Sequence, residues 1–307
     1  MKVGFSLPQL GSQATPENLI AVAERAESLG YNSLWVLERL LVPTHPREPY
    51  PATEDGKLPA TYQSVLDPIE TLTFVAAHTK KVRLGTSVLV LPYHSPVILA
   101  RRLTTLDVLS GGRLDVGIGA GWSTDEFEAA GVPFANRGAR TEELLQALIS
   151  IWTEDKVEFK GRFYTIPESI IGPKPVQKPH PPIYVAGFGR YALERAVKYG
   201  AGWNPSGVPA FEWLEDMIRQ LKEIARAAGR DHIEVSLRVF PVVFDKSIGA
   251  ERKAVQGTLA EIKADLARLK DAGVTELIYS IPEIGWVDTP EIAPGLARME
   301  QLIELTP

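Results

Sequence analysis

Short runs of apolar residues alternate along the chain with longer segments in which apolar residues recur at helical spacing. The first apolar run, Lys2 to Leu7, is typical of a strand and ends at a cluster of turn-forming residues at positions 8–11. In the helical segment that follows, Thr15 is expected to be the N-cap, Pro16 the first helical residue and Gly30 the C-terminal stop. The beginning of the chain therefore predicts a strand followed by a helix.

The same rhythm repeats until eight strands are predicted. The later strands are expected at Tyr31–Leu37, Val82–Leu91, Leu114–Ile118, Ile183–Ala186, Gly202–Pro205, Glu234–Val239 and Thr275–Ile281. The later helices are expected at about Pro96–Ser110, Arg140–Trp152, Tyr191–Tyr199, Phe211–Ala228, Thr258–Ala272 and Pro290–Leu305. Apolar strands alternating with amphipathic helices build a parallel sheet covered by helices, and eight strands can close it. The pattern predicts an α/β fold, a single (β/α)8 TIM barrel over residues 1–307.

Two proline-rich segments interrupt this rhythm as insertions after strands two and four. They span Glu38 to Leu66 and Lys156 to Pro182, and both are too long for ordinary connections. The first follows the second strand, so it is expected at the carboxyl ends of the barrel strands, where such barrels carry their active sites. We predict that it is a lid and that both insertions set substrate specificity.

Composition excludes several classes of protein. The 307 residues include no cysteine, which excludes disulfides, thiolate nucleophiles and Cys-ligated metals. A net charge of −5 argues against nucleic-acid binding. The sequence has neither the length of apolar run that a membrane span needs nor a signal-peptide pattern, so a cytoplasmic protein is expected. The five histidines lack the spacing of metal ligands, and we predict no metal site.

Three glycine-containing motifs follow one another in the first half of the chain. They are Leu84-Gly85-Thr86-Ser87-Val88, Ser110-Gly111-Gly112-Arg113 and Gly117-Ile118-Gly119-Ala120-Gly121-Trp122. A dinucleotide-binding fingerprint is disfavoured for the last, because its third glycine comes one residue too early. In this order the motifs resemble those of the luciferase-like family of flavin- and F420-dependent oxidoreductases.

The resemblance implies a homodimeric enzyme that transfers a hydride between the deazaflavin F420 and a small organic substrate. Deazaflavin has carbon at the reactive nitrogen position of flavin, so it carries hydride but activates oxygen poorly. Two alternatives stay open, namely an FMN-dependent monooxygenase and a barrel that binds flavin or F420 without turnover.

Two segments are implied by the resemblance to hold the cofactor. A non-prolyl cis peptide at Ser87–Val88 is expected to bulge against the cofactor's central ring, unless this is an ordinary strand end. The glycine-rich turn Gly187-Phe188-Gly189-Arg190 lies between a strand and a helix, where backbone N–H groups bind anions. It is expected to hold the cofactor phosphate, with Arg190 as counter-charge and Ser206 as an added hydroxyl, or else to be a tight barrel turn.

The catalytic residues are expected near the end of the second strand. F420 users of the family commonly carry an Asp-His pair where this chain has Glu38-Arg39. Glu38 keeps the carboxylate, but Arg39 stays protonated and cannot replace a histidine in acid–base work, and a surface ion pair is the alternative. His45 in the first insertion is expected to reach the carboxyl ends of the barrel strands, the mouth of the barrel, as a titrating group, unless it is a solvated loop residue. His94 is the next candidate.

Trp122 and Asp125 complete the predicted site. The indole of Trp122 offers a flat apolar wall to a planar substrate, at a position where sugar-phosphate dehydrogenases of the family carry glutamate. We therefore do not expect a glucose-6-phosphate enzyme. Asp125 is expected to hydrogen-bond cofactor or substrate, or alternatively to cap the helix that begins there.

Overall fold

The computed structural model describes residues 1–53, 55–249 and 252–306. Within them, eight parallel strands form a closed barrel in the order β3, β2, β1, β13, β10, β9, β8 and β5, with β5 pairing back to β3. These strands are β1 (Lys2–Ser6), β2 (Ser33–Val36), β3 (Arg83–Thr86), β5 (Leu114–Gly119), β8 (Ile183–Val185), β9 (Gly202–Trp203), β10 (Glu234–Val239) and β13 (Glu276–Tyr279). The predicted barrel is confirmed.

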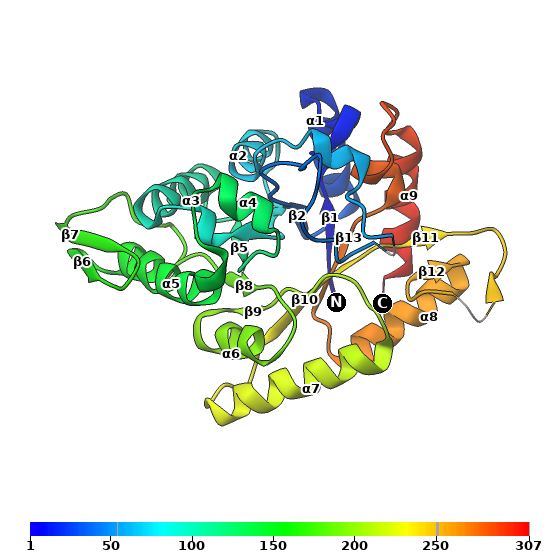
Figure 1. Cartoon of the computed structure of the whole chain (residues 1–307). Helices are drawn as coiled ribbons and strands as arrows, with labels where there is room; N and C mark the ends of the chain where they lie inside the picture. Colours follow the sequence, from blue (N-terminus) through cyan, green and yellow to red (C-terminus); the bar gives the residue numbers. More distant parts are fainter. Residues whose placement is uncertain (54, 250–251, 307) are drawn as a thin grey trace.

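Helices surround this barrel (Figure 1). They are α1 (Pro16–Leu29), α2 (Pro68–His78), α3 (Pro96–Ser110), α5 (Arg137–Thr153), α6 (Arg190–Tyr199), α7 (Phe211–Ala227), α8 (Leu259–Ala272) and α9 (Ala293–Leu305), with the short α4 (Thr124–Ala129). The Thr15 side chain caps α1 by accepting from the N–H of Asn18, and Gly30 ends that helix at a φ of 87°. Helix α9 begins three residues later than predicted, because Pro294 rather than Pro290 lies in its first turn.

A fully buried tryptophan, Trp35 of β2, lies between the neighbouring strands β1 and β3. Its indole lies against glycines of both neighbouring strands. A Cβ on Gly85 would lie 2.3 Å from Trp35 Cε3, and one on Gly4 would lie 2.6 Å from Trp35 Nε1. Glycine is therefore required at both positions for the ring to fit.

The third predicted strand, Val82–Leu91, is divided in the structure. Strand β3 ends at Thr86, and β4 (Leu89–Val90) follows after a cis peptide between Ser87 and Val88. Strand β4 pairs with β5 beyond the point where β3 leaves it. The cis bond implied by the family resemblance is present.

The first insertion packs against the carboxyl ends of the strands around its own apolar cluster. Leu10, Leu37 and Tyr62 form the buried part of this cluster. The insertion returns to the barrel through a bridge between Val65 and Leu10. It therefore borders the mouth, as its position after β2 predicted.

The second insertion follows helix α5 rather than strand β5. It opens with the hairpin of β6 (Val157–Lys160) and β7 (Thr165–Ser169), which projects from the barrel in Figure 1. Farther on, the Gln177 side chain donates to the carbonyl of Leu114, the first residue of β5. This segment thus reaches the amino ends of the strands, away from the carboxyl ends that the first insertion borders, and its role in specificity stays a prediction.

A short parallel pair, β11 (Val242–Val243) with β12 (Gln256–Gly257), lies between β10 and α8 in the chain. Among the described residues, none of the helices has the length and apolar character needed to cross a membrane.

Candidate functional site

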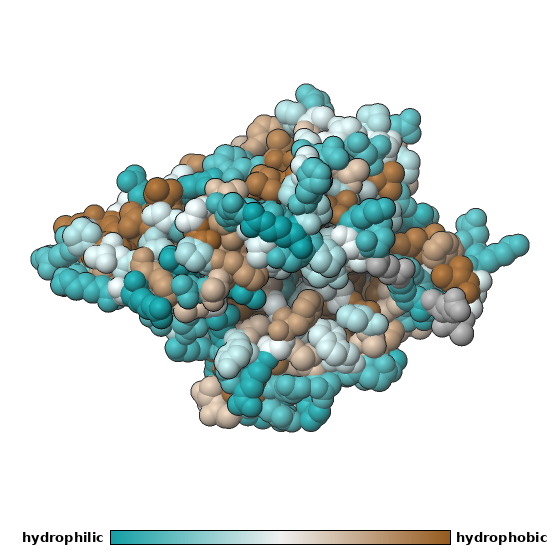
Figure 2. Space-filling view, in the orientation of Figure 1, coloured by the Kyte–Doolittle hydropathy of each residue, from teal (hydrophilic) through white to brown (hydrophobic). Residues whose placement is uncertain are grey.

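The carboxyl ends of the barrel strands carry a ring of polar side chains. Parallel strands bring their carboxyl ends to one face, which is where ligands bind in barrels of this kind. Buried side chains at these ends come from β1, β10 and the residues that follow β3, β9 and β13, namely Ser6, Arg238, Ser87, Asn204 and Ser280. We refer to this end as the mouth. Figure 2 shows one face of the molecule with a hollow near its centre.

Arg238 lies at the centre of this ring. Its Nη1 donates to the Ser87 carbonyl at 2.9 Å, and its Nε and Nη2 donate to the hydroxyls of Ser280 and Ser6 at 2.8 and 2.9 Å. Burial lowers the pKa of Arg238 below its usual value. The guanidinium nevertheless remains a cation, because arginine is not deprotonated in proteins.

The residues of the cis peptide pack against the glycine motif of β5. A Cβ on Gly117 would lie 1.8 Å from the Thr86 carbonyl oxygen, and one on Gly119 would lie 2.9 Å from Val88 Cγ2. The Ser87 hydroxyl donates to Asn204 Oδ1 at 2.9 Å. The first two glycines of the Gly-x-Gly-x-Gly run thus allow β5 to pass close to this segment, which explains the spacing without a dinucleotide.

Glu38 forms a carboxylate–imidazole pair with His94. Glu38 Oε1 lies 2.8 Å from His94 Nε2, and Glu38 Oε2 accepts from the N–H of Val90 at 2.6 Å. The Glu38 side chain is 4% exposed and that of His94 is 15% exposed, so the imidazole is the member that reaches solvent. The chain therefore has a carboxylate–histidine pair at the mouth although the adjacent Asp-His pair of the family is missing.

Arg39 points away from this pair, into a buried cage that joins the first insertion to α4. Its Nη1 lies 3.1 Å from Glu126 Oε2, and its guanidinium carbon lies 5.1 Å from the ring centre of Trp122 and 5.2 Å from that of Tyr62. Both members of the ion pair are buried, at 6% and 4% exposure. The alternative of a surface ion pair is therefore wrong for Arg39.

Asp125 and Trp122 also contact the first insertion. Asp125 accepts from the backbone N–H of Arg47 at 3.1 Å and lies 3.3 Å from its Nε. Trp122 packs on Tyr50 with ring centres 5.5 Å apart. Ser123, rather than Asp125, caps α4. The structure thus places both predicted site residues between α4 and the insertion.

His45 is exposed on the first insertion, where its Nδ1 lies 3.2 Å from the Thr44 hydroxyl. Among the described contacts, none joins His45 to Glu38 or Trp122. The structure therefore brings His94, rather than His45, to the predicted carboxylate.

The glycine-rich turn before α6 presents unpaired backbone donors. Gly187 and Gly189 have φ values of 117° and 98°, which favour glycine. Within the described chain, the N–H groups of Gly189, Arg190 and Tyr191 have no acceptor, since the first N–H groups of a helix lack partners within it. Such a turn fits an anion such as a phosphate.

The neighbouring side chains are arranged differently from the expectation. Arg190 is exposed and pairs with Glu194 at 2.7 Å, so its charge is already engaged. Phe188 is 58% exposed and packs edge-on against Trp213. Ser206 is exposed and forms a bridge with Arg238 in β10. The backbone of the turn, rather than Arg190, is the stronger feature for binding an anion.

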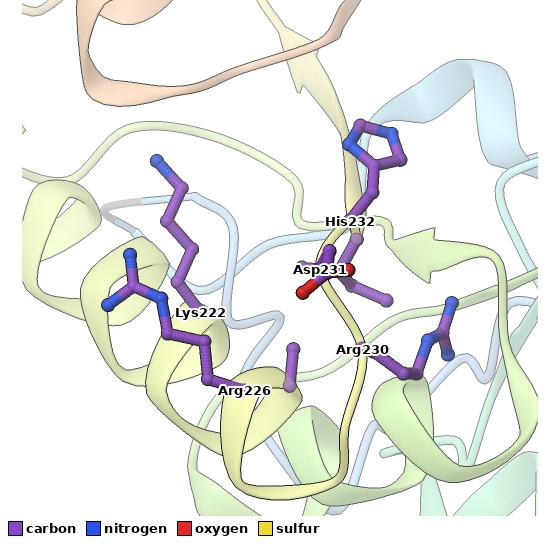
Figure 3. Close-up of a pocket in the computed structure, with 7 residues that line it drawn as sticks. Lys222, Arg226, Arg230, Asp231 and His232 are labelled. Carbon is purple, nitrogen blue, oxygen red and sulfur yellow. The ribbon is translucent and has the colours of Figure 1, made fainter.

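A separate basic pocket of about 220 Å³ lies where α7 ends and β10 begins, at the end of the barrel opposite the mouth (Figure 3). Lys222 donates to the carbonyl of Ala272 at the end of α8, and Arg230 donates to that of Val197 at the end of α6. Cations at helix C-termini stabilise the helices, which accounts for these two charges.

The fold and the mouth define a TIM-barrel protein whose polar groups converge at the carboxyl ends of its strands. A family model described as luciferase-like monooxygenase matches residues 1–280. The chain belongs to this family, whose members are flavin- or F420-dependent oxidoreductases or monooxygenases.

Relatives of this chain differ in cofactor. An uncharacterised protein of Mycobacterium tuberculosis is 34% identical over 86% of both chains. An F420-dependent glucose-6-phosphate dehydrogenase of Amycolatopsis mediterranei is 30% identical over 74% of this chain and 64% of its own length. An FMNH2-dependent dimethylsulfone monooxygenase of Pseudomonas putida is 34% identical over 62% of this chain and 51% of its own length.

Solved structures share the fold. An F420-dependent secondary alcohol dehydrogenase superposes with a TM-score of 0.78 at 21% identity over 100% of this chain and 99% of its own. The monooxygenase RslO1 of Streptomyces bottropensis superposes with a TM-score of 0.77 at 24% identity, over 99% of this chain and 98% of its own. These likenesses support the barrel alone.

Sequence reasoning missed Arg238 and ranked His94 below His45. A signal for Arg238 was present, because alternate residues of a barrel strand point inward and a charged residue at such a position near the strand's carboxyl end is unusual. The pairing of Glu38 with His94 had no local signal, since the two residues are far apart in the sequence.

Proposed function

We propose that this chain is an F420-dependent oxidoreductase that transfers a hydride between the deazaflavin and a small organic substrate. The observation that carries the proposal is the Glu38–His94 pair at the mouth, beside the segment Ser87–Val88. Reduction of a carbonyl requires a proton as well as a hydride, and a carboxylate-oriented imidazole is suited to supply it.

The cofactor supplies the hydride, and this chain supplies orientation and the proton. Ser87 and Val88 would hold the ring, and the backbone N–H groups of the turn at Gly187–Arg190 would hold the phosphate. Glu38 would accept the Nε2 proton of the His94 ring and so fix its orientation, and the proton delivered to the substrate oxygen would come from Nδ1 of the imidazolium form. The relative that uses F420 covers more of this chain than the relative that uses FMNH2, which favours the same cofactor.

A second candidate is an FMN-dependent monooxygenase, because the FMNH2-dependent relative has the higher identity over its aligned segment. The deciding experiment is a fluorescence titration of the purified apo-protein with F420 and, separately, with FMN. We expect micromolar or tighter binding of F420 and at least about tenfold weaker binding of FMN, a difference of roughly 1.4 kcal/mol. Tighter binding of FMN than of F420 would favour the monooxygenase function instead. Binding of neither cofactor would refute the cofactor assignment.

A further inference from the structure

Arg238 is a buried cation without a counter-ion. The residue is 5% exposed, and no carboxylate of the described residues lies within ion-pair distance of its guanidinium. The titratable groups that face it are the phenols of Tyr50 and Tyr62. Burial holds the pKa of Tyr62 well above its usual value, so that phenol stays neutral. The positive charge therefore has no compensation within the described protein.

Hydrogen-bond donors also outnumber acceptors around Arg238. A guanidinium has five N–H groups, and three of them donate to Ser87, Ser280 and Ser6. The two serine hydroxyls lie 2.5 Å apart, so one proton is used between them and the other has no described acceptor. Two guanidinium N–H groups and one hydroxyl proton at the mouth are thus left without an acceptor among the described residues.

Arg113 shows what a purely structural arginine looks like in this fold. It likewise lacks a carboxylate hydrogen bond, but its five N–H groups all have acceptors. These acceptors are the carbonyls of Ala76, Thr79, Val82 and Ser110 and the hydroxyl of Thr79. Arg83, the first residue of β3, pairs with Asp115 at 2.5 Å. Arg238 differs from both because its charge and its donors are incompletely satisfied.

We propose that Arg238, with the hydroxyls of Ser6 and Ser280, is an anion-binding site at the centre of the mouth, beside the carbonyl of Ser87. A buried charge is normally paired, and its desolvation cost is offset when a ligand brings the opposite charge. The anion has two sources of the same chemistry, namely the deprotonated pyrimidine edge of the reduced cofactor or a carboxylate of the substrate. The inference rests on the proposed function only for the first source.

The first measurement compares the thermal stability of apo-protein variants with and without a small carboxylate. Sodium formate replaces sodium fluoride at constant ionic strength for the wild type, Arg238→Gln and the matched control Arg113→Gln. We expect Arg238→Gln to be at least as stable as the wild type without formate, because an uncompensated charge has been removed. Arg113→Gln is expected to be clearly less stable, because it leaves carbonyls unpaired.

The second measurement separates the two sources. If the anion belongs to the reduced cofactor, Arg238→Gln weakens binding of the reduced form at least about tenfold more than binding of the oxidised form. If it belongs to the substrate, both forms bind as in the wild type, and formate raises the Tm of the wild type saturably but not that of Arg238→Gln. Arg238→Lys, which keeps the charge, is expected to retain most of either effect.

Loss of stability in Arg238→Gln comparable to that in Arg113→Gln, with formate binding and both cofactor affinities unchanged, would overturn the proposal. A wild type that binds neither F420 nor FMN would refute the proposed function instead. In that case the formate series on the apo-protein still decides whether Arg238 binds an anion.

Discussion

The two carboxylate oxygens of Glu38 bind different groups: Oε2 accepts from the amide of Val90, and Oε1 contacts the imidazole of His94. Together these contacts restrict the carboxylate to one orientation. A buried carboxylate held in this way positions the histidine, while the histidine itself reaches solvent. The division of roles at the mouth is therefore asymmetric, with His94 as the candidate acid and Glu38 as the positioning residue.

His94→Asn is the corresponding test at the scale of single residues. We expect kcat to fall by about 10²–10⁴, since that is the usual contribution of a positioned acid or base, while cofactor affinity stays within about threefold. The measurement is steady-state kinetics across pH together with the cofactor titration. Glu38→Gln should lower kcat less and alter the pH profile of the rate.

His232→Asn serves as the control, because His232 lies in the basic pocket at the opposite end of the barrel. If His45→Asn, rather than His94→Asn, abolished turnover, the acid would belong to the exposed insertion and the assignment to His94 would be wrong.

Among the elements, the turn before α6 combines a left-handed backbone with unpaired amides. A Cβ on Gly189 would meet no atom within 4 Å, so Gly189→Ala changes the backbone preference without a clash. We expect a loss of about 1–3 kcal/mol in stability from the φ of 98° and ψ of 168°, and a loss of about tenfold in cofactor affinity as the amides shift.

The matched control is Gly229→Ala. Gly229 has a φ of 73° and equally open surroundings after α7, far from the mouth. It should lose no more stability than Gly189→Ala and leave cofactor affinity unchanged. Equal cofactor affinity in both variants would show that the turn does not bind the phosphate.

The first insertion is held to α4 by the buried ion pair of Arg39 with Glu126 and by the ion pairs of Arg47 with Asp125 and Glu128. Glu126 accepts from the N–H of Leu40 and the hydroxyl of Tyr93 in addition to its ion pair with Arg39. Replacing it by Gln leaves the Arg39 charge unpaired in a cage of aromatic rings. We expect a loss of about 3–5 kcal/mol, measured by urea unfolding.

Glu128→Gln provides the comparison on the same helix. Glu128 pairs with Arg47, but both side chains are more than half exposed, at 64% and 55%. Water and salt screen such a pair, so the change should stay within about 0.5 kcal/mol. Equal losses in the two variants would contradict the structural importance of the buried cage.

At the scale of the whole molecule, the strand and helix pattern was sufficient to predict the barrel, because each strand buries its apolar residues locally. The location of the second insertion was not predictable from length alone. Its place depends on whether it follows a strand or a helix; it begins after helix α5, and Gln177 contacts Leu114 at the amino end of β5. Whether the charge of Arg238 is compensated depends on which residues surround it, and only the closed barrel brings those residues together.

The barrel interior opposite the mouth holds a second group of buried polar residues around Glu276. The carboxyl of Glu276 accepts from the hydroxyls of Ser33 and Ser236 at 2.5 and 2.7 Å. Burial raises its pKa to about 7, with those two hydrogen bonds acting in the opposite direction. A carboxyl inside the closed barrel should therefore bind a proton across a range in which the unfolded chain has released it.

This shift makes the stability of the whole barrel depend on pH. Below the ordinary glutamate pKa of about 4.5 both states are protonated, and the contribution of Glu276 is fully present. As pH rises towards 7 the unfolded state has lost the proton while the folded state keeps it, so stability falls. Above 7 both states are ionised and the contribution is lost. Between pH 5 and 8 we expect a decrease of about 2–3 kcal/mol from this group.

Glu276→Gln isolates this contribution, since glutamine does not titrate and its amide retains an oxygen that accepts a hydrogen bond. Urea unfolding of both proteins at pH 5, 6, 7 and 8 gives the difference in free energy at each pH. The wild type should lose stability relative to the variant as pH rises, with most of the change below pH 7. A pH-independent difference would mean that Glu276 is already ionised at pH 5, so that the buried hydroxyls and nearby cations hold its charge inside the barrel.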